Sequence, residues 1–175
     1  QEAGTLPGID VASNIFAGRL ERFSRLGFLN WKKIYEEADA ILDEIGVPEI
    51  RGRMNIEQLN FEDRKIVEIA RAMASHPEIL IIDETTTALA TKGRKIIYDL
   101  IQRMHKENKA ILFISHDLDE LMEVCNTITV LRDGVIIDTL DRENMSVERM
   151  RTLMIGRELT GSYFRPDFLC RPLLF

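Results

Sequence analysis

The sequence predicts an α/β fold built around a parallel β-sheet. Two apolar runs, residues 79–82 and 110–114, have the length and lack of alternation expected of strands that are buried on both faces. Between them, residues 92–107 carry apolar side chains at helical spacing. Strand, helix and strand in this order form a right-handed βαβ unit, so the two strands are expected to lie parallel in one sheet.

The composition is that of a soluble globular protein of about one domain. Of the 175 residues, 45% are hydrophobic and 30% are charged, and no apolar run reaches the length of a membrane span. The net charge of -6 argues against nucleic acid as the main partner, because nucleic-acid-binding proteins carry a basic surface. Cys125 and Cys170 lack the spacing of metal ligands, which indicates a reduced, intracellular setting.

Before the first strand the pattern is helical. We expect a short helix at 11–16 capped by Asp10, a helix that starts after Asn30 and closes at Gly46, and a third helix at 64–75. Residues 23–29 form an apolar, irregular link in this interpretation, and Trp31 is expected in the core. Because no strand separates these helices, they indicate a helical insertion packed beside the sheet.

After the second strand, the sequence predicts a helix, a hairpin and a last helix. The helix covers residues 118–125, and the hairpin strands, 128–131 and 135–137, flank Asp133-Gly134. Ser146 caps the last helix, whose inward residues are expected to be Val147, Met150, Leu153 and Met154. The tail after Arg157 has no periodicity.

Polar residues follow both predicted strands of the sheet. Asp83 and Glu84 end the first strand, and His116 lies just beyond the second. Open α/β sheets bind ligands at the carboxyl ends of their strands. Adjacent strand residues point in opposite directions, so the two acids serve one site only if the chain turns there, as residues 85–87 allow. One acid could then face a metal ion and the other a water molecule. The alternative is a buried strand followed by an ordinary polar loop, with His116 as a surface or capping residue.

Four motifs resemble those of one family when they are taken together. In chain order they are LNFEDRKIVEIARA (59–72), ILIIDETTTAL (79–89), ILFISHDLDEL (111–121) and ITVLRDG (128–134). They resemble the signature loop and its helix, the Walker B strand with the D-loop, the switch-histidine loop and the terminal hairpin of ABC transporter nucleotide-binding domains. NIFAGR (14–19) and MIGREL (154–159) resemble the sugar-import branch, whose ATPases carry two such domains in tandem.

The resemblance implies a fold and a division of the chain. The fold is an α/β P-loop NTPase (RecA-like) parallel sheet core with an α-helical signature subdomain. Residues 1–20 would hold the Q-loop and the following segment, 21–76 the helical subdomain, and 77–160 the Walker B, D-loop, switch-histidine and hairpin parts. Residues 161–175 form an irregular tail. Because the sequence has no GxxxxGK[ST] phosphate loop, we expect an incomplete domain that is inactive by itself.

The resemblance also implies roles for individual residues. Gln1 would reach Mg²⁺ and the attacking water, and Asp83 would hold Mg²⁺ through water. Glu84 would polarise the attacking water, and His116 would contact the γ-phosphate of ATP. The D-loop would consist of Thr87, Ala88, Leu89 and Ala90, with alanine at position 90 where many relatives have aspartate.

The implied activity is ATP hydrolysis, with ATP and Mg²⁺, that powers the import of a sugar. The implied partners are a second ABC ATPase domain, a transmembrane permease and, indirectly, an external sugar-binding protein. The implied location is the cytoplasmic face of the membrane, with no nucleic acid involved. A non-hydrolysing regulatory domain of the same shape is the alternative.

The signature loop, residues 59–63, departs from the family pattern LSGGQ. Here it consists of Leu59, Asn60, Phe61, Glu62 and Asp63. In the family this loop caps the nucleotide bound on the opposite domain, so the two acids would bring negative charge toward a polyanion. We therefore hypothesise an asymmetric pair of ATP sites, in which this loop faces the weaker one. The alternative is that the loop tolerates variation and its acids face solvent.

Overall fold

The computed structural model describes residues 4–155, apart from the side chains of residues 87 and 88. The chain divides after Asp117 into two compact units. Gln1, Cys170 and the predicted tail lie outside the described residues. The predicted boundaries at residues 20, 76 and 160 stay predictions.

The first part of the first unit is helical. Its helices are α1 (Val11–Ile15), a 3₁₀ turn (Leu20–Phe23), α2 (Trp31–Ile45), a second 3₁₀ turn (Ile56–Gln58) and α3 (Phe61–Met73). The predicted caps are confirmed. The Asp10 carboxylate accepts from the Ser13 N–H at 2.7 Å, the Asn30 side chain accepts from the Lys33 N–H at 3.1 Å, and Gly46 ends α2 with a φ of 97°.

The three helices enclose one hydrophobic core. Their fully buried members include Ile15, Phe16, Ile34, Leu42 and Val67. These side chains recur at helical spacing, so each helix buries one apolar stripe against the other two. The predicted run of helices is therefore confirmed, and no strand of the main sheet interrupts it in the described residues.

The link between α1 and α2 differs from the expectation. Instead of an irregular segment, β1 (Ser24–Arg25) and β2 (Phe28–Leu29) form a small antiparallel hairpin that turns at Leu26 and Gly27. Leu26 adopts a φ of 53°, which is uncommon for leucine and gives no turn signal in the sequence. Trp31 is also not a core residue: it is 43% exposed and stacks on Tyr35, because it begins α2 before the buried stripe starts at Ile34.

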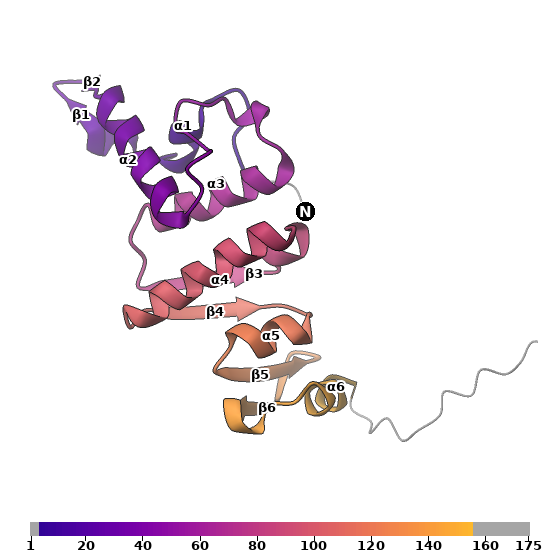
Figure 1. The fold of residues 1–175 in the computed structure, drawn as a ribbon. Helices are drawn as coiled ribbons and strands as arrows, with labels where there is room; N and C mark the ends of the chain where they lie inside the picture. Colours follow the sequence, from indigo (N-terminus) through magenta and orange to yellow (C-terminus); the bar gives the residue numbers. More distant parts are fainter. Residues whose placement is uncertain (1–3, 156–175) are drawn as a thin grey trace, which may run out of the picture. The chain divides into compact units, whose positions relative to one another are not determined.

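The second part of the first unit is the predicted βαβ unit. β3 (Ile79–Asp83) leads through a 3₁₀ turn (Thr85–Ala88) into α4 (Thr91–Lys106), and the chain returns in β4 (Ala110–Ile114). The strands pair in parallel from Ile79 opposite Ala110 to Asp83 opposite Ile114, and α4 runs alongside them (Figure 1). The strands, the helix and their order are confirmed.

The predicted burial of β3 on both faces is wrong. Leu80 and Ile82 are buried, whereas Ile79 and Ile81 are 66% and 62% exposed. Among the described elements, α4 packs against one face of this two-stranded sheet, so only alternate residues are covered. An unbroken apolar run does not reveal how many layers cover a strand.

The second unit contains α5 (Leu118–Val124), β5 (Thr127–Arg132), β6 (Val135–Asp141), a 3₁₀ turn (Arg142–Asn144) and α6 (Val147–Ile155). β5 and β6 form the predicted hairpin, and Asp133 and Gly134 both have a positive φ, as a tight two-residue turn requires. The Ser146 hydroxyl accepts from the Arg149 N–H at 3.2 Å, so this cap is also confirmed. Met150 is buried as expected, but Met154 is 42% exposed, contrary to the prediction.

Candidate functional site

The two parallel strands deliver their polar residues to one edge of the sheet. Asp83 is the last residue of β3 and lies opposite Ile114, the last residue of β4. The Glu84 N–H donates to the Ile114 carbonyl at 2.9 Å, so the pairing continues one residue beyond β3. This register brings the segment after β4, which carries His116, beside the two acids.

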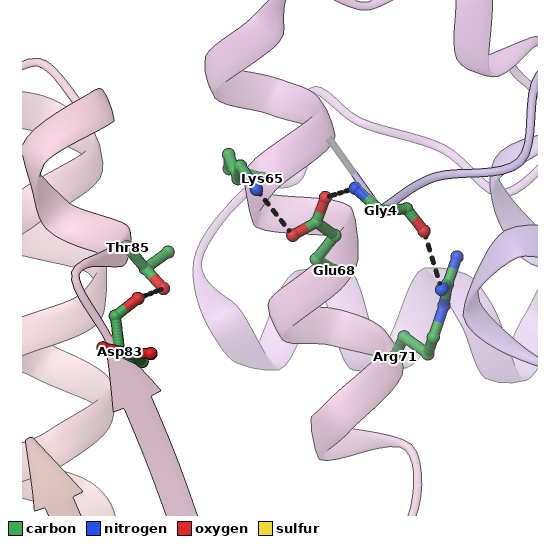
Figure 2. A network of polar contacts seen from close by, with 6 residues as sticks. All are labelled: Gly4, Lys65, Glu68, Arg71, Asp83 and Thr85. Carbon is green, nitrogen blue, oxygen red and sulfur yellow. Dashed lines mark hydrogen bonds and ion pairs between the residues drawn. The ribbon is translucent and has the colours of Figure 1, made fainter. Parts of the chain in front are cut away.

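The chain turns at Glu84, as the candidate site requires. Glu84 adopts a φ of 47° and a ψ of 19°, in the left-handed region, and a 3₁₀ turn follows at once. This conformation costs a residue with a Cβ about 1–2 kcal/mol, and such costs concentrate at functional sites. The Thr85 hydroxyl donates to the Asp83 carbonyl at 3.3 Å and supports the turn (Figure 2). Asp83 and Glu84 are therefore not held on opposite sides of a continuous strand.

The Glu84 carboxylate meets the His116 imidazole. Glu84 Oε1 lies 3.2 Å from His116 Nδ1, and the two side chains are 42% and 66% exposed. An acid and an imidazole in contact at a solvent-accessible sheet edge can orient a water molecule and donate a hydrogen bond to an anion. The second ring nitrogen, Nε2, remains as a further donor or acceptor, depending on the tautomer.

The Asp83 side chain has the chemistry of a magnesium ligand. It is exposed, and among the described residues nothing donates a hydrogen bond to its carboxylate. Mg²⁺ in phosphate-binding sites is typically held by one or two carboxylates together with waters and phosphate oxygens, so a single acid at this position fits. Over residues 4–155, no group of three or more His, Cys, Asp and Glu side chains gathers in a way that could hold a metal ion.

Helix α3 begins within the predicted signature loop, earlier in the chain than expected. Asn60 caps α3 by accepting from the Asp63 N–H at 2.9 Å, so the helix starts at Phe61 and not at Arg64. Both acids thus lie in its first turn, where the helix dipole favours negative charge. Phe61 is 45% exposed. Burial, followed by the nearby carboxylates of Glu62 and Glu49, raises the pKa of Asp63.

Glu62 takes neither of the two orientations expected from the sequence. Its carboxylate accepts a hydrogen bond from the Gly93 N–H at 3.1 Å, within the first turn of α4. In the predicted D-loop, Leu89 is buried, and Ala90 precedes α4 without any side-chain cap. Gln1 and the side chains of Thr87 and Ala88 lie outside the described residues.

One polar network was not predicted from the sequence. The Glu68 carboxylate accepts from the Gly4 N–H and from Lys65 Nζ, the latter at 3.0 Å (Figure 2). Arg71 donates to the Gly4 carbonyl at 3.0 Å and to the Asn14 carbonyl at 2.7 Å. The available signal was the helical spacing of Lys65, Glu68 and Arg71, which places them on one face of α3. The network fastens the segment after the predicted Q-loop to α3.

Comparison with known proteins gives consistent relatives. No family model matches the chain. It is 36% identical over 159 residues to the ribose import ATP-binding protein RbsA of Caldanaerobacter subterraneus subsp. tengcongensis, which covers 91% of this chain and 32% of the relative. It is 35% identical over 163 residues to the xylose import ATP-binding protein XylG of Pseudomonas fluorescens, which covers 93% of this chain and 31% of the relative. The chain thus spans about a third of the length of these relatives.

Solved structures share the fold. A putative metal-chelate type ABC transporter in an inward-facing conformation superposes with a TM-score of 0.69 at 19% identity, over 85% of this chain and 58% of that one. A dimeric bacterial ABC transporter cassette gives a TM-score of 0.66 at 22% identity, over 81% of this chain and 60% of that one. The chain belongs to the ABC ATPase family, as the identity to the two import ATP-binding proteins indicates. The expected P-loop NTPase fold class is confirmed. The chain contains a part of that fold. Within residues 4–155, every helix is too short or too polar to span a lipid bilayer.

Proposed function

We propose that this chain is part of the ATPase of an ABC importer, which couples ATP hydrolysis to the uptake of a sugar. The observation that carries the proposal is the contact of Glu84 with His116 at 3.2 Å, beside Asp83, at the carboxyl ends of two parallel strands. The ribose and xylose import ATP-binding proteins among its relatives support a sugar as the transported substrate.

Each residue of this edge has a separate task in the proposal. Glu84 polarises the attacking water, and its carboxylate lies against His116. His116, held in place by Glu84, contacts a γ-phosphate oxygen of ATP, and Asp83 would hold Mg²⁺ with the help of Gln1. When bound, Mg²⁺ neutralises charge that develops on the phosphate oxygens. Phosphoryl transfer depends mainly on positioning and charge stabilisation, which this edge is built to supply.

The proposal includes partners that complete the site. The signature loop and the D-loop face a second ABC ATPase domain, and the dimeric state of one solved cassette supports such a pair. A membrane permease receives the motion, and an external sugar-binding protein delivers the sugar to it. The protein would accordingly work at the cytoplasmic face of the membrane.

The test is Glu84→Gln in the complete protein that contains this chain. We expect ATP turnover to fall by about 10²–10⁴, because the general base is lost, while ATP binding is retained. Glu143→Gln, which neutralises an exposed acid of the second unit, is the matched control and should leave turnover unchanged. Unchanged turnover in Glu84→Gln would remove Glu84 from its role.

One observation favours the alternative of a non-hydrolysing regulatory domain. The signature loop is altered, and its acid Glu62 is bonded within its own domain to Gly93. If the unmodified complete protein binds ATP but does not hydrolyse it, this alternative replaces the ATPase. The retention of both Glu84 and His116 supports hydrolysis.

A further inference from the structure

Two unusual residues of this chain meet in space. Glu62 stands at the second glycine position of the LSGGQ pattern, and Gly93 stands in the first turn of α4. Glycine weakens a helix at such a position, and Gly93 has no positive φ that would require it. The Gly93 N–H donates a hydrogen bond to the Glu62 carboxylate at 3.1 Å, so the two unusual residues are in direct contact.

The reason for a glycine at position 93 is space. A Cβ on Gly93 would collide with Glu62 Oε1 and would lie 3.2 Å from the Leu89 Cβ. In its present orientation, the Glu62 carboxylate occupies the space that a Cβ at residue 93 would need, so a side chain there would force the carboxylate to shift.

The start of α4 needs the acceptor that Glu62 supplies. Ala90 precedes the helix and has no side chain that could cap it. The Glu62 carboxylate satisfies one free N–H and places negative charge at the positive end of the helix dipole. An ion pair also joins the start of α4 to the helical part of the unit. Lys92, in the first turn of α4, pairs with Glu49, in the segment after α2, at 2.5 Å.

We propose that Glu62 is a positioning residue that fastens the signature loop to the start of α4, so that this loop and the D-loop move as one body. The inference rests on the proposed function, because both segments are expected to face a second ABC domain. In this arrangement the charge of Glu62 is used within its own domain and does not oppose a bound nucleotide. Glu62 acts on turnover through the placement of the two loops.

The contact itself is tested by a double-mutant cycle in the complete protein. Gly93→Ala and Glu62→Ala should each lower the unfolding midpoint by about 2–4 °C, the first through the collision and the second through the lost cap. In the background of Glu62→Ala, the change Gly93→Ala should cost less than it does alone, because only the contact with the Leu89 Cβ remains and alanine favours the helix. Strictly additive shifts would overturn the proposal.

The positioning role is tested by steady-state kinetics with ATP. Glu62→Ala should lower kcat about tenfold with an unchanged KM for ATP, because misplaced loops slow the assembled state. Glu62→Gln keeps a hydrogen-bond acceptor and should restore most of kcat. Glu57→Ala removes an exposed acid just before the same loop and serves as the control.

Two kinetic outcomes would overturn the proposal. A lower KM for ATP in Glu62→Gln would mean that the acid opposes a nucleotide, and an unchanged kcat in Glu62→Ala would leave Glu62 with a structural role alone. If the unmodified protein does not hydrolyse ATP, the proposed function fails, whereas the stability cycle still decides whether Glu62 and Gly93 are coupled.

Discussion

At the scale of single residues, the helical part depends on one buried amide. Asn14 has no exposed surface, and its side chain uses its full hydrogen-bonding capacity. Its oxygen accepts from the Leu6 N–H and from Arg71, and its nitrogen donates to the carbonyls of Leu6 and Asp10. A buried polar group satisfied in this way specifies one arrangement of the chain, which here places the segment after Gly4 against α3.

Arg71→Ala should therefore destabilise the protein by about 2–3 kcal/mol. The change removes charge-assisted hydrogen bonds to Gly4 and Asn14 and leaves a buried acceptor without its donor. Thermal unfolding measures the effect. Arg25→Ala, an exposed arginine on the β1–β2 hairpin, should change stability by less than about 0.5 kcal/mol. Equal losses in the two variants would contradict the role given to Arg71.

The raised pKa of Asp63 gives a prediction on pH. Because burial, Glu62 and Glu49 raise the pKa in the folded state, the folded protein binds this proton more tightly than the unfolded chain does. Protonated Asp63 therefore stabilises the folded state at a pH below the pKa of aspartate in the unfolded chain. This stabilisation is lost as the pH rises through the raised pKa of the folded state. Asp63→Asn should increase stability by about 0.5 kcal/mol at pH 7 and have no such benefit in acid. A benefit that is the same at both pH values would contradict this assignment.

At the scale of elements, periodicity and caps predicted most of the helices and strands. α2, α4, β3, β4 and the β5–β6 hairpin lie within a residue or two of their predicted starts, since each carries a cap, a turn pair or a regular apolar pattern. α3 begins before the predicted Arg64, because the Asn60 side chain caps the helix and brings Phe61, Glu62 and Asp63 into its first turn. The β1–β2 hairpin was missed because its turn uses leucine in a conformation that asparagine or glycine usually adopts.

Leu26→Asn should accordingly stabilise this hairpin. Leucine at a φ of 53° is strained, and its side chain is 91% exposed, so no packing is lost when it is replaced. Asparagine tolerates the conformation, and the expected gain is about 0.5–1 kcal/mol in thermal unfolding. Gly27→Ala places a Cβ at a φ of 83° and should act in the opposite direction. If Leu26→Asn destabilises the protein, the leucine has a packing partner in the complete molecule.

The sequence predicts the strand-end residues of the candidate site, but not the contact between the signature loop and α4. Asp83, Glu84 and His116 follow apolar strands, and parallel pairing brings strand ends together whatever the rest of the fold does. The bond between Glu62 and Gly93 joins two helix starts that are 31 residues apart, and no local pattern encodes that distance. A glycine in a helix without a turn to explain it was the one available signal.

At the scale of the whole molecule, the sheet of the first unit presents an apolar face. Ile79, Ile81, Leu112 and Ile114 are between 43% and 66% exposed, and strand register places them on the same side as Asp83. Contiguous exposed apolar surface of this kind marks an interaction site or promotes association. The apolar face borders the proposed ATP site, so a partner that covers this face would also lie close to Asp83.

We expect the 175-residue chain, expressed alone, to self-associate through this face. Ile81→Thr with Leu112→Thr should shift it toward monomer in sedimentation velocity, because threonine keeps the strand propensity while it removes apolar surface. Ile97→Thr is the control, since Ile97 is fully buried in α4: it should cost about 2–4 kcal/mol and not restore a monomer. A chain that is already monomeric at about 100 µM, where exposed apolar surfaces normally associate, would contradict the prediction.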